Sequence, residues 1–384
     1  MPERVLEIQA LAPLLWCDGR PFAATEGNET AARSLPLPLP STVAGFVRTQ
    51  VGKGRGLSFD DPQALQNLHG LQVCAPLLVR GGQFVLPAPR DAVIYKKDDK
   101  KDEKKDEKLQ VMRLLPKALE AGHGCDLPEG LLPLEVTEDI KPETGYNFWT
   151  ADDLTHWLLG QEVVPQKIGG LPEETRIHVG IDPSTGKANE GVLYSVTYRR
   201  LESLEEGQYH PWSIRARVKL AEGEEPEPLG YLGGECRPVR VTAYPNAKLS
   251  EYWFDCPGEI KQAFARLKAG DMVRMVLATP ALFEGGWRPG WLDKFGQMNL
   301  PAGVGTVRLK LVAAAVGRRE PVSGWSLRER KPRPVRWMAP AGSVYFFEVE
   351  EGDPSRLLES WLRPVSDHQQ DRKDGFGLAL WGVC

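Results

Sequence analysis

The feature that most constrains this chain is a proline-punctuated segment placed directly before a helix. In Leu35–Pro40 (LPLPLP) each proline lacks an amide proton and holds the preceding residue in extended geometry, so this segment cannot be helical. Ser41 and Thr42 follow as candidate N-caps. Apolar residues then recur at helical spacing and predict a helix over 42–51; they are Val43, Phe46, Val47 and Val51.

The opposite face of this helix has little side-chain bulk. It carries Gly45, Arg48, Thr49 and Gly52. The sequence GKGRG follows, with Lys53 and Arg55 between three glycines. A helix N-terminus, a guanidinium and such a loop are together typical of an anion site. The alternative interpretation is a surface helix with a flexible exit loop.

The composition allows two cores and excludes several classes of protein. With 384 residues, 41% of them hydrophobic, the chain can bury two cores. The 39 glycines and 32 prolines predict many short elements and long ordered loops instead of a helical bundle. A formal net charge of -4 excludes a protein that coats nucleic acid by bulk positive potential, although it allows a local basic track.

The cysteines and the N-terminal sequence indicate a cytoplasmic protein. The six cysteines are far apart and form no CxxC pair, so we expect reduced thiols and no zinc site. The N-terminal sequence has early charges and no long apolar run, which argues against a signal peptide. No segment approaches the roughly 20 apolar residues of a membrane span, so we expect no membrane partner.

The order of predicted elements indicates an α+β fold with two domains. Strands are predicted over 5–15, 71–79, 83–86, 176–181, 192–199, 212–220, 236–244, 272–278, 307–316 and 343–350, and further helices over 150–159, 257–267 and 354–362. A β–α–β–β series therefore occurs twice, changing near residue 205, which predicts domains over 1–205 and 206–384, each an antiparallel sheet backed by helices. The charged run over 96–108 is predicted to be a solvated insertion.

The predicted strand over 176–181 has one apolar and one cationic face. Ile177, Val179 and Ile181 are expected to face the core, and Arg176, His178 and Gly180 to face outward. A strand of this kind can lie on a core and meet a polyanion on its other side.

No catalytic or metal-binding motif is present in the sequence, so we expect no catalytic residue, metal or cofactor. His178 is the one histidine that could act as a general base for attack by an RNA 2′-hydroxyl. The alternative is a strand histidine that bonds within the sheet or stacks on a base.

Basic and aromatic residues interleave in the second half of the chain. Arg288 lies between Trp287 and Trp291 in the sequence GGWRPGW. Basic residues also crowd the strip from 307 to 337; they are Arg308, Lys310, Arg318, Arg319, Arg328, Arg330, Lys331, Arg333 and Arg336, with Trp325 and Trp337 among them. This combination favours single-stranded RNA, which is bound by phosphate neutralisation and base stacking. The alternative is that the tryptophans are core residues and the arginines pair with glutamates.

Several motifs in one order resemble a known family. They are GRPF, LPLPLPSTVAGFVRT, RIHVGIDPSTGKANEGVLYS, GGECR, AGVGTVRLK, PAGSVYFFEV and GFGLALWG. Together they resemble subunit three of the Cmr complex, the type III-B CRISPR effector, in the RAMP superfamily (repeat-associated mysterious proteins), over nearly the whole chain. The resemblance implies two ferredoxin-like, RRM-related domains.

The resemblance also implies a role and a set of contact residues. The subunit would hold the repeat-derived 5′ tag of the CRISPR RNA (crRNA) beside the large palm-domain subunit and the first backbone RAMP subunit, as part of a hetero-oligomer in antiviral defence. Residues that would face the tag are Ser41, Thr42 and Arg48, with Arg176, His178 and Lys187 lining the same groove. Gly375, Phe376 and Gly377 correspond to the glycine-rich loop of RAMP proteins, shortened here. The run over 96–108 departs from the family pattern.

Three hypotheses follow. The first is a non-catalytic RNA-binding subunit, with Lys53, Arg55 and Arg288 as further contacts. The second is a metal-independent RAMP endoribonuclease that processes CRISPR precursor RNA with His178 as base. The third is an adaptor that binds only proteins.

Overall fold

The structure is a computed structural model that describes residues 2–18, 30–97, 108–120, 122–205, 207–245, 247, 249–326 and 331–384. The chain forms two compact units. The first comprises Met1–Gly82, Gly170–Tyr252 and Val322–Arg336, and the second comprises Gln83–Gly169, Trp253–Pro321 and Trp337–Cys384. Each unit is therefore assembled from distant segments, whereas the sequence predicts one boundary near residue 205.

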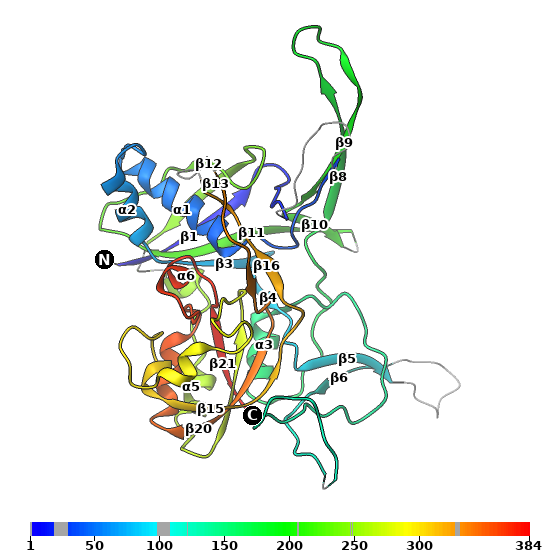
Figure 1. The fold of residues 1–384 in the computed structure, drawn as a ribbon, viewed down its shortest axis with the longest axis vertical. Coiled ribbons are helices and arrows are strands. Elements are labelled where there is room, and N and C mark those ends of the chain that lie inside the picture. The colour runs from blue at the N-terminus through cyan, green and yellow to red at the C-terminus, as the bar shows by residue number, and fades with distance from the viewer. Residues whose placement is uncertain are drawn as a thin grey trace. The chain divides into compact units, whose positions relative to one another are not determined.

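The first unit is built on a five-stranded antiparallel path (Figure 1). The strands lie in the order β12 (Leu229–Tyr231), β13 (Pro238–Tyr244), β1 (Glu3–Ala10), β11 (Gln208–Lys219) and β3 (Val73–Arg80), and β10 (Glu202–Glu205) pairs with β11. If β1, β3, β11 and β13 are numbered one to four along the chain, their order across the sheet is fourth, first, third, second. This is the ferredoxin-like arrangement. The strands β11 and β13 follow residue 205, yet both pair with β1, which explains the interleaved division of the chain.

Two helices connect β1 to β3 in this unit. They are α1 (Pro40–Gly54) and α2 (Pro62–Gly70). The predicted apolar stripe of α1 is confirmed, because Val43, Val47 and Val51 are buried. Between β11 and β13 the described residues form only the short edge strand β12 and no helix. The four-residue helix α4 (Leu249–Tyr252) follows β13.

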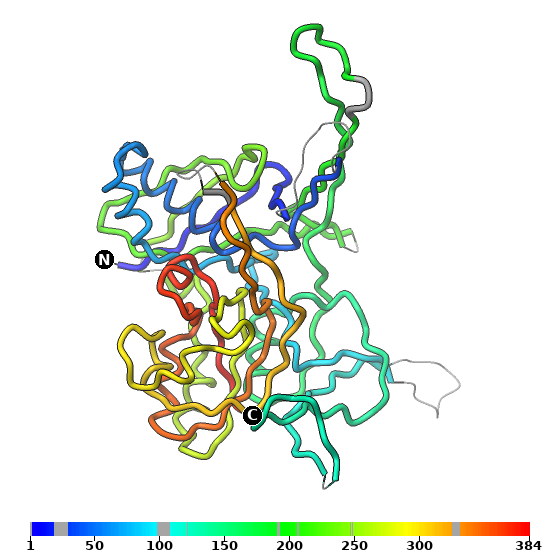
Figure 2. The backbone as a smooth tube through the Cα atoms, in the orientation of Figure 1, coloured from blue at the N-terminus to red at the C-terminus, as the bar shows by residue number. Residues whose placement is uncertain are grey.

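A long two-stranded ribbon, which we call the arm, extends from the first unit. It consists of β8 (Glu173–Ile181) and β9 (Ala188–Arg199), and β9 also pairs with β2 (Ala31–Ala32). At the base of the arm Val196 and Tyr198 pack with Leu15 and Ala32 in a small core. Figure 2 traces the remainder of the arm beyond the sheet of its unit.

The second unit repeats the ferredoxin-like strand order. Across its antiparallel sheet the strands are β15 (Arg308–Ala315), β20 (Val344–Glu351), β14 (Met272–Leu277) and β21 (Ala379–Val383). Along the chain these are the second, third, first and fourth strands, which is the order of the first unit read from the opposite edge. The sheet is buried on both faces, since the adjacent residues Phe346 and Phe347 are both inaccessible to solvent. The prediction of an α+β fold with antiparallel sheets is confirmed.

Smaller elements complete the described structure. The second unit contains the pairs β4 (Gln83–Pro87) with β7 (Phe148–Thr150) and β5 (Ala92–Lys97) with β6 (Lys108–Arg113), the helices α3 (Ala151–Leu158), α5 (Gly258–Phe264) and α6 (Gln369–Lys373), and the 3₁₀ helices η2 (Gly290–Lys294), η3 (Val304–Thr306) and η4 (Pro354–Ser360). Two short pairs, β16 (Glu320–Val322) with β19 (Arg336–Met338) and β17 (Trp325–Ser326) with β18 (Lys331–Pro332), follow β15.

Two predictions about helices differ in outcome. Thr150 caps α3 as predicted, because its hydroxyl accepts a hydrogen bond from the Asp153 amide at 3.1 Å. The helix predicted over 354–362 is present over Pro354–Ser360, but it is a 3₁₀ helix, and Trp361 bonds back three residues before it bridges to Ala379. Most of the charged run over 96–108 and the whole GRPF motif lie outside the described residues.

Candidate nucleic-acid interface

The predicted anion site at the start of α1 is not formed as expected. The helix begins at Pro40, and the N-cap is Leu39, so Ser41 and Thr42 lie within the first turn and do not cap it. The N-cap prediction is wrong because a proline with fixed φ starts the helix at residue 40, two residues before the predicted start. Ser41 and Thr42 are half-buried on the helix surface.

Arg48 is an internal residue. Its guanidinium is buried and donates hydrogen bonds from Nε and Nη2 to the Leu71 carbonyl oxygen, at 3.1 and 2.7 Å. A carbonyl at the end of α2 is thereby satisfied. Arg48 therefore holds two helices together, and the prediction that it faces RNA phosphate is not supported by its position.

The glycine residues of α1 are largely explained by close packing. A Cβ at Gly52 would lie 2.8 Å from Leu68 Cδ1, and one at Gly54 would lie 1.9 Å from the Glu225 carbonyl oxygen. Gly45 differs, because nothing lies within 4 Å of the corresponding position. Of the helical glycines on this face, Gly45 is thus the one with open space beside it.

The basic residues of GKGRG divide between solvent and an ion pair. The helix continues through Gly54, so Lys53 is helical and exposed. Arg55 lies 2.9 Å from Glu224 through Nε, and this hydrogen-bonded partner lowers the pKa of Glu224. Lys53 is the cation of this group that remains open to an anionic ligand.

The two faces of the arm are the reverse of the prediction. Ile177, Val179, Ile181 and, across the ladder, Leu193 are all exposed, with Ile177 at 72%. Core contact is made instead by the face of Val196 and Tyr198. The prediction failed because alternation in a strand gives two faces but does not say which one meets the core.

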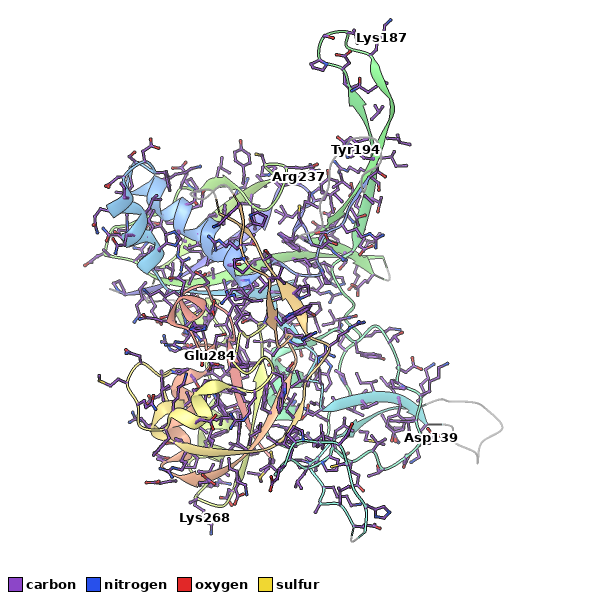
Figure 3. All side chains as sticks on the ribbon, viewed as in Figure 1. Asp139, Lys187, Tyr194, Arg237, Lys268 and Glu284 are labelled. Atoms are coloured by element: carbon purple, nitrogen blue, oxygen red, sulfur yellow. The ribbon has the colours of Figure 1, made fainter. Side chains whose placement is uncertain are left out.

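The polar face of the arm is already paired at its base. The His178 ring stacks on Tyr194 with 5.2 Å between ring centroids, and its Nε2 is enclosed. Arg176 forms an ion pair with Glu174. Figure 3 shows Lys187 at the far end of the arm and Tyr194, the strand partner of His178, nearer its base, so the structure does not bring Lys187 together with Arg176 and His178.

A cluster at the base of the arm was not identified from sequence. The Tyr198 hydroxyl donates to Glu235, and the Arg237 guanidinium lies 4.0 Å from the centroid of the Tyr198 ring. Glu235 and its neighbour Cys236 both have positive φ, at 57° and 48°, which is unusual for residues with a Cβ. The motif GGECR is visible in the sequence, but the partner Tyr198 is distant in the chain. The cluster joins β9 to the turn before β13.

The second unit buries most of its predicted contacts. Arg288 forms a two-point ion pair with Asp293, at 2.5 and 2.8 Å, and Trp291 is a core residue. Gly375, Phe376 and Gly377 are also buried. Gly375 accepts a hydrogen bond from Thr279 Oγ1 at 2.9 Å, so this terminal motif supports the fold instead of forming an open loop.

One basic–aromatic surface of the predicted strip remains exposed. The Arg319 guanidinium lies 4.2 Å from the centroid of the Trp337 ring, which is 43% exposed, and Arg318 beside it is exposed too. Neither arginine has an ion pair with the residues that the structure describes. By contrast, Lys310 lies 3.3 Å from Glu348. We call Arg318, Arg319 and Trp337 the stacking surface; Arg328 and Arg330 lie outside the described residues.

Two further features concern metal-ligand clusters and long apolar helices in the described part of the chain. No group of three or more His, Cys, Asp or Glu side chains there could hold a metal ion. No helix among these residues is long and apolar enough to cross a membrane.

The family of the chain is established by comparison with known proteins. A family model described as CRISPR-associated protein (Cas_Cmr3) matches residues 6–384. The chain belongs to the Cmr3 family. This membership confirms the resemblance drawn from the ordered sequence motifs. No curated protein matches the chain in sequence.

Solved structures are similar over most of this Cmr3-family chain. A chain of the type III-B Cmr-beta complex bound to cognate target RNA and AMPPnP has 15% identity and a TM-score of 0.45, covering 89% of this chain and 86% of that one. A chain of the Csm3–Csm4 subcomplex of the type III-A interference complex has 8% identity and a TM-score of 0.35, covering 91% and 94%.

Proposed function

We propose that this protein is a non-catalytic RNA-binding subunit of a type III-B CRISPR effector. It holds the 5′ tag of the crRNA and docks the large palm-domain subunit and a backbone RAMP subunit. Membership of the Cmr3 family over residues 6–384 is the observation that carries the proposal. The stacking surface supports it, because unpaired guanidiniums and an exposed indole suit phosphates and bases of single-stranded RNA.

The residues that we propose to contact the tag differ from those expected from the sequence. Lys53 on α1 and Lys187 on the arm are exposed and have no ion pair among described residues, so they are the candidates that remain in the first unit. Arg48, Arg55 and Arg176 act within the protein first, because each is bound to a carbonyl or a carboxylate. Arg288 is similarly engaged by Asp293.

The proposal is tested by RNA binding at fixed ionic strength. We expect the double variant Arg319→Gln, Trp337→Ala to bind tagged crRNA more weakly by about 1–3 kcal/mol per contact, with a salt dependence reduced by about one counterion. The matched control is Arg288→Gln, which removes an arginine already paired with Asp293. Equal affinity of the double variant and the control would contradict the role of the stacking surface.

The endoribonuclease hypothesis receives no support from the position of His178. A general base must reach the hydroxyl whose proton it removes, but the His178 Nε2 is enclosed and the ring is stacked on Tyr194. We expect no 2′,3′-cyclic phosphate product when the protein is incubated with repeat RNA in EDTA. Appearance of that product, and its loss in His178→Gln, would favour the enzyme instead.

A further inference from the structure

The connection between β6 and β7 is long, irregular and anchored. Residues 114–147 contain no described helix or strand. Backbone hydrogen bonds nevertheless order it, among them Leu132 N to Val312 O at 2.8 Å, Glu135 N to Leu115 O at 2.9 Å, and Lys117 N to Pro133 O at 3.0 Å. An irregular connection of this length inside a compact unit is usually functional or disordered, and these bonds argue for function.

This connection exposes a group of aliphatic side chains. They are Leu115, Leu119, Leu127 and Val136, the last of which is 59% exposed. Single exposed leucines are common on protein surfaces, but several in one projecting segment are typical of an interaction site. Figure 2 shows the segment as a teal loop that extends away from the β5–β6 pair.

The same segment is strongly acidic. Residues 114–147 have seven acidic residues and two lysines, and one of these, Lys117, is bound to Glu135. Asp126, Glu129 and Asp139 have no ion pair with the described residues. Figure 3 marks Asp139 on this segment.

The acidic charges of this segment favour one class of binding partner over the others. RNA is repelled, because a polyanion gains no counterion release from carboxylates. A symmetric contact between two copies would place the same acidic segment against itself, which like charges disfavour. A basic protein surface with an apolar centre gains from both the leucines and the carboxylates.

We propose that the acidic apolar segment, defined by Leu115, Leu119, Leu127, Val136, Asp126 and Glu129, docks another protein subunit of the same effector. The matching surface on that subunit is an apolar patch surrounded by lysine and arginine. This inference rests on the proposed function and specifies the part of the chain that makes a protein contact, separate from the stacking surface.

The experiment uses two variants of the segment in the reconstituted effector. Leu119→Ser with Leu127→Ser removes apolar contact, and Asp126→Lys with Glu129→Lys reverses charge. Met298→Ser, which changes an 89% exposed side chain elsewhere in the same unit, is the control for the first. Glu162→Lys with Glu259→Lys, which makes the same charge change at two exposed sites, is the control for the second.

The chain is co-expressed with the remaining subunits of its effector and a crRNA, and subunit content is measured by native mass spectrometry. Bound RNA is quantified separately, and thermal unfolding of the isolated chain checks that each variant folds. We expect both segment variants to lose one protein subunit by about tenfold in occupancy, while the controls keep it. The charge-reversal variant should regain part of the loss as salt rises.

Three outcomes would overturn the proposal. If the segment variants keep every subunit while the unmodified chain assembles normally, the docking surface is wrong and the proposed function survives. If the variants instead abolish a homodimer, the occupant is a second copy of this chain. If the unmodified chain assembles with no subunit, the proposed function fails and this inference fails with it.

Discussion

Arg274 and Asp91 form an ion pair in the second unit, with 2.8 Å between Nη1 and Oδ2, and neither side chain is accessible to solvent. Asp91 also accepts a hydrogen bond from Trp157 Nε1 at 2.9 Å, and the Arg113 guanidinium stacks on the Trp157 ring at 3.5 Å. The carboxylate of Asp91, in the turn before β5, thereby joins β14 and α3. Burial is the main cause that lowers the pKa of Arg113, to about 10. Because this pKa is still well above neutral pH, the guanidinium stays charged there.

Loss of one partner of this pair should be costly. We expect Asp91→Ala to lower the free energy of unfolding by about 3–5 kcal/mol, because it leaves the Arg274 charge buried without a partner. Urea unfolding at neutral pH measures the change. Asp293→Ala, which breaks the exposed pair with Arg288, should cost only about 0–1 kcal/mol. Similar costs for both variants would show that burial does not control the contribution of this pair.

The lowered pKa of the buried Glu7 predicts how the stability of the first unit changes in acid. Burial by itself would raise the pKa of Glu7, but hydrogen bonds from Tyr244 and Ser213 and the charge of Arg215 outweigh it and lower the pKa below its ordinary value of 4.5. A lowered pKa in the folded state stabilises the protein above about 4.5, and this stabilisation is lost as the pH falls through the folded-state pKa. Burial also raises the pKa of Tyr244 to about 12, so its hydroxyl stays a donor over this range.

The measurement compares the unmodified chain with Glu7→Gln. We expect their difference in unfolding free energy to be largest near neutral pH and to shrink as the pH falls below about 4.5. Urea unfolding at intervals between about pH 7 and about pH 3 follows it. A difference that stays constant over this range would contradict the assignment.

The glycines of α1 predict opposite effects of the same substitution. Gly54→Ala would place a Cβ 1.9 Å from the Glu225 carbonyl oxygen, so we expect destabilisation through displaced backbone. Gly45→Ala meets no atom within 4 Å, and it should stabilise the helix by about 0.5–1 kcal/mol through better helix propensity. Thermal unfolding of the two variants distinguishes packing from conformational preference. Stabilisation by both would show that Gly54 is not a close-packing site.

The burial of side chains on the arm predicts which of its two faces stabilises the fold. Ile177→Thr alters a side chain that is 72% exposed, so we expect a change of no more than about 0.5 kcal/mol in unfolding free energy. Val196→Ala alters a buried neighbour of Leu15 and Tyr198 and should cost about 1–3 kcal/mol. If the Ile177 variant proved the more destabilising, the orientation of the arm would be reversed. Chemical denaturation measures both.

Local patterns predicted the elements well because they depend on nearby residues. The cap at Thr150, the stripe of α1 and the strands of both sheets each follow from side chains within a few positions of one another. The start of α1 was misplaced because Pro40 can itself occupy the first helical turn.

The candidate contacts were predicted less well, because charge and exposure depend on distant partners. Arg48 is engaged by Leu71 and Arg288 by Asp293, whereas Arg319 lies over an exposed indole and has no ion pair with the described residues. Nothing in the local sequence separates these three arginines.

By itself, the sequence determined the class of fold, the spacing of its elements and the family, since these follow from periodicity, proline and glycine positions and the order of motifs. Only the tertiary structure decided that β11 and β13 join the sheet of β1, which face of the arm meets the core, and which cations remain available to a ligand. The physical reason is that pairing across the sheet and burial of a charge are set by residues far apart in the chain. A guanidinium meets its carboxylate or carbonyl only after the chain has folded.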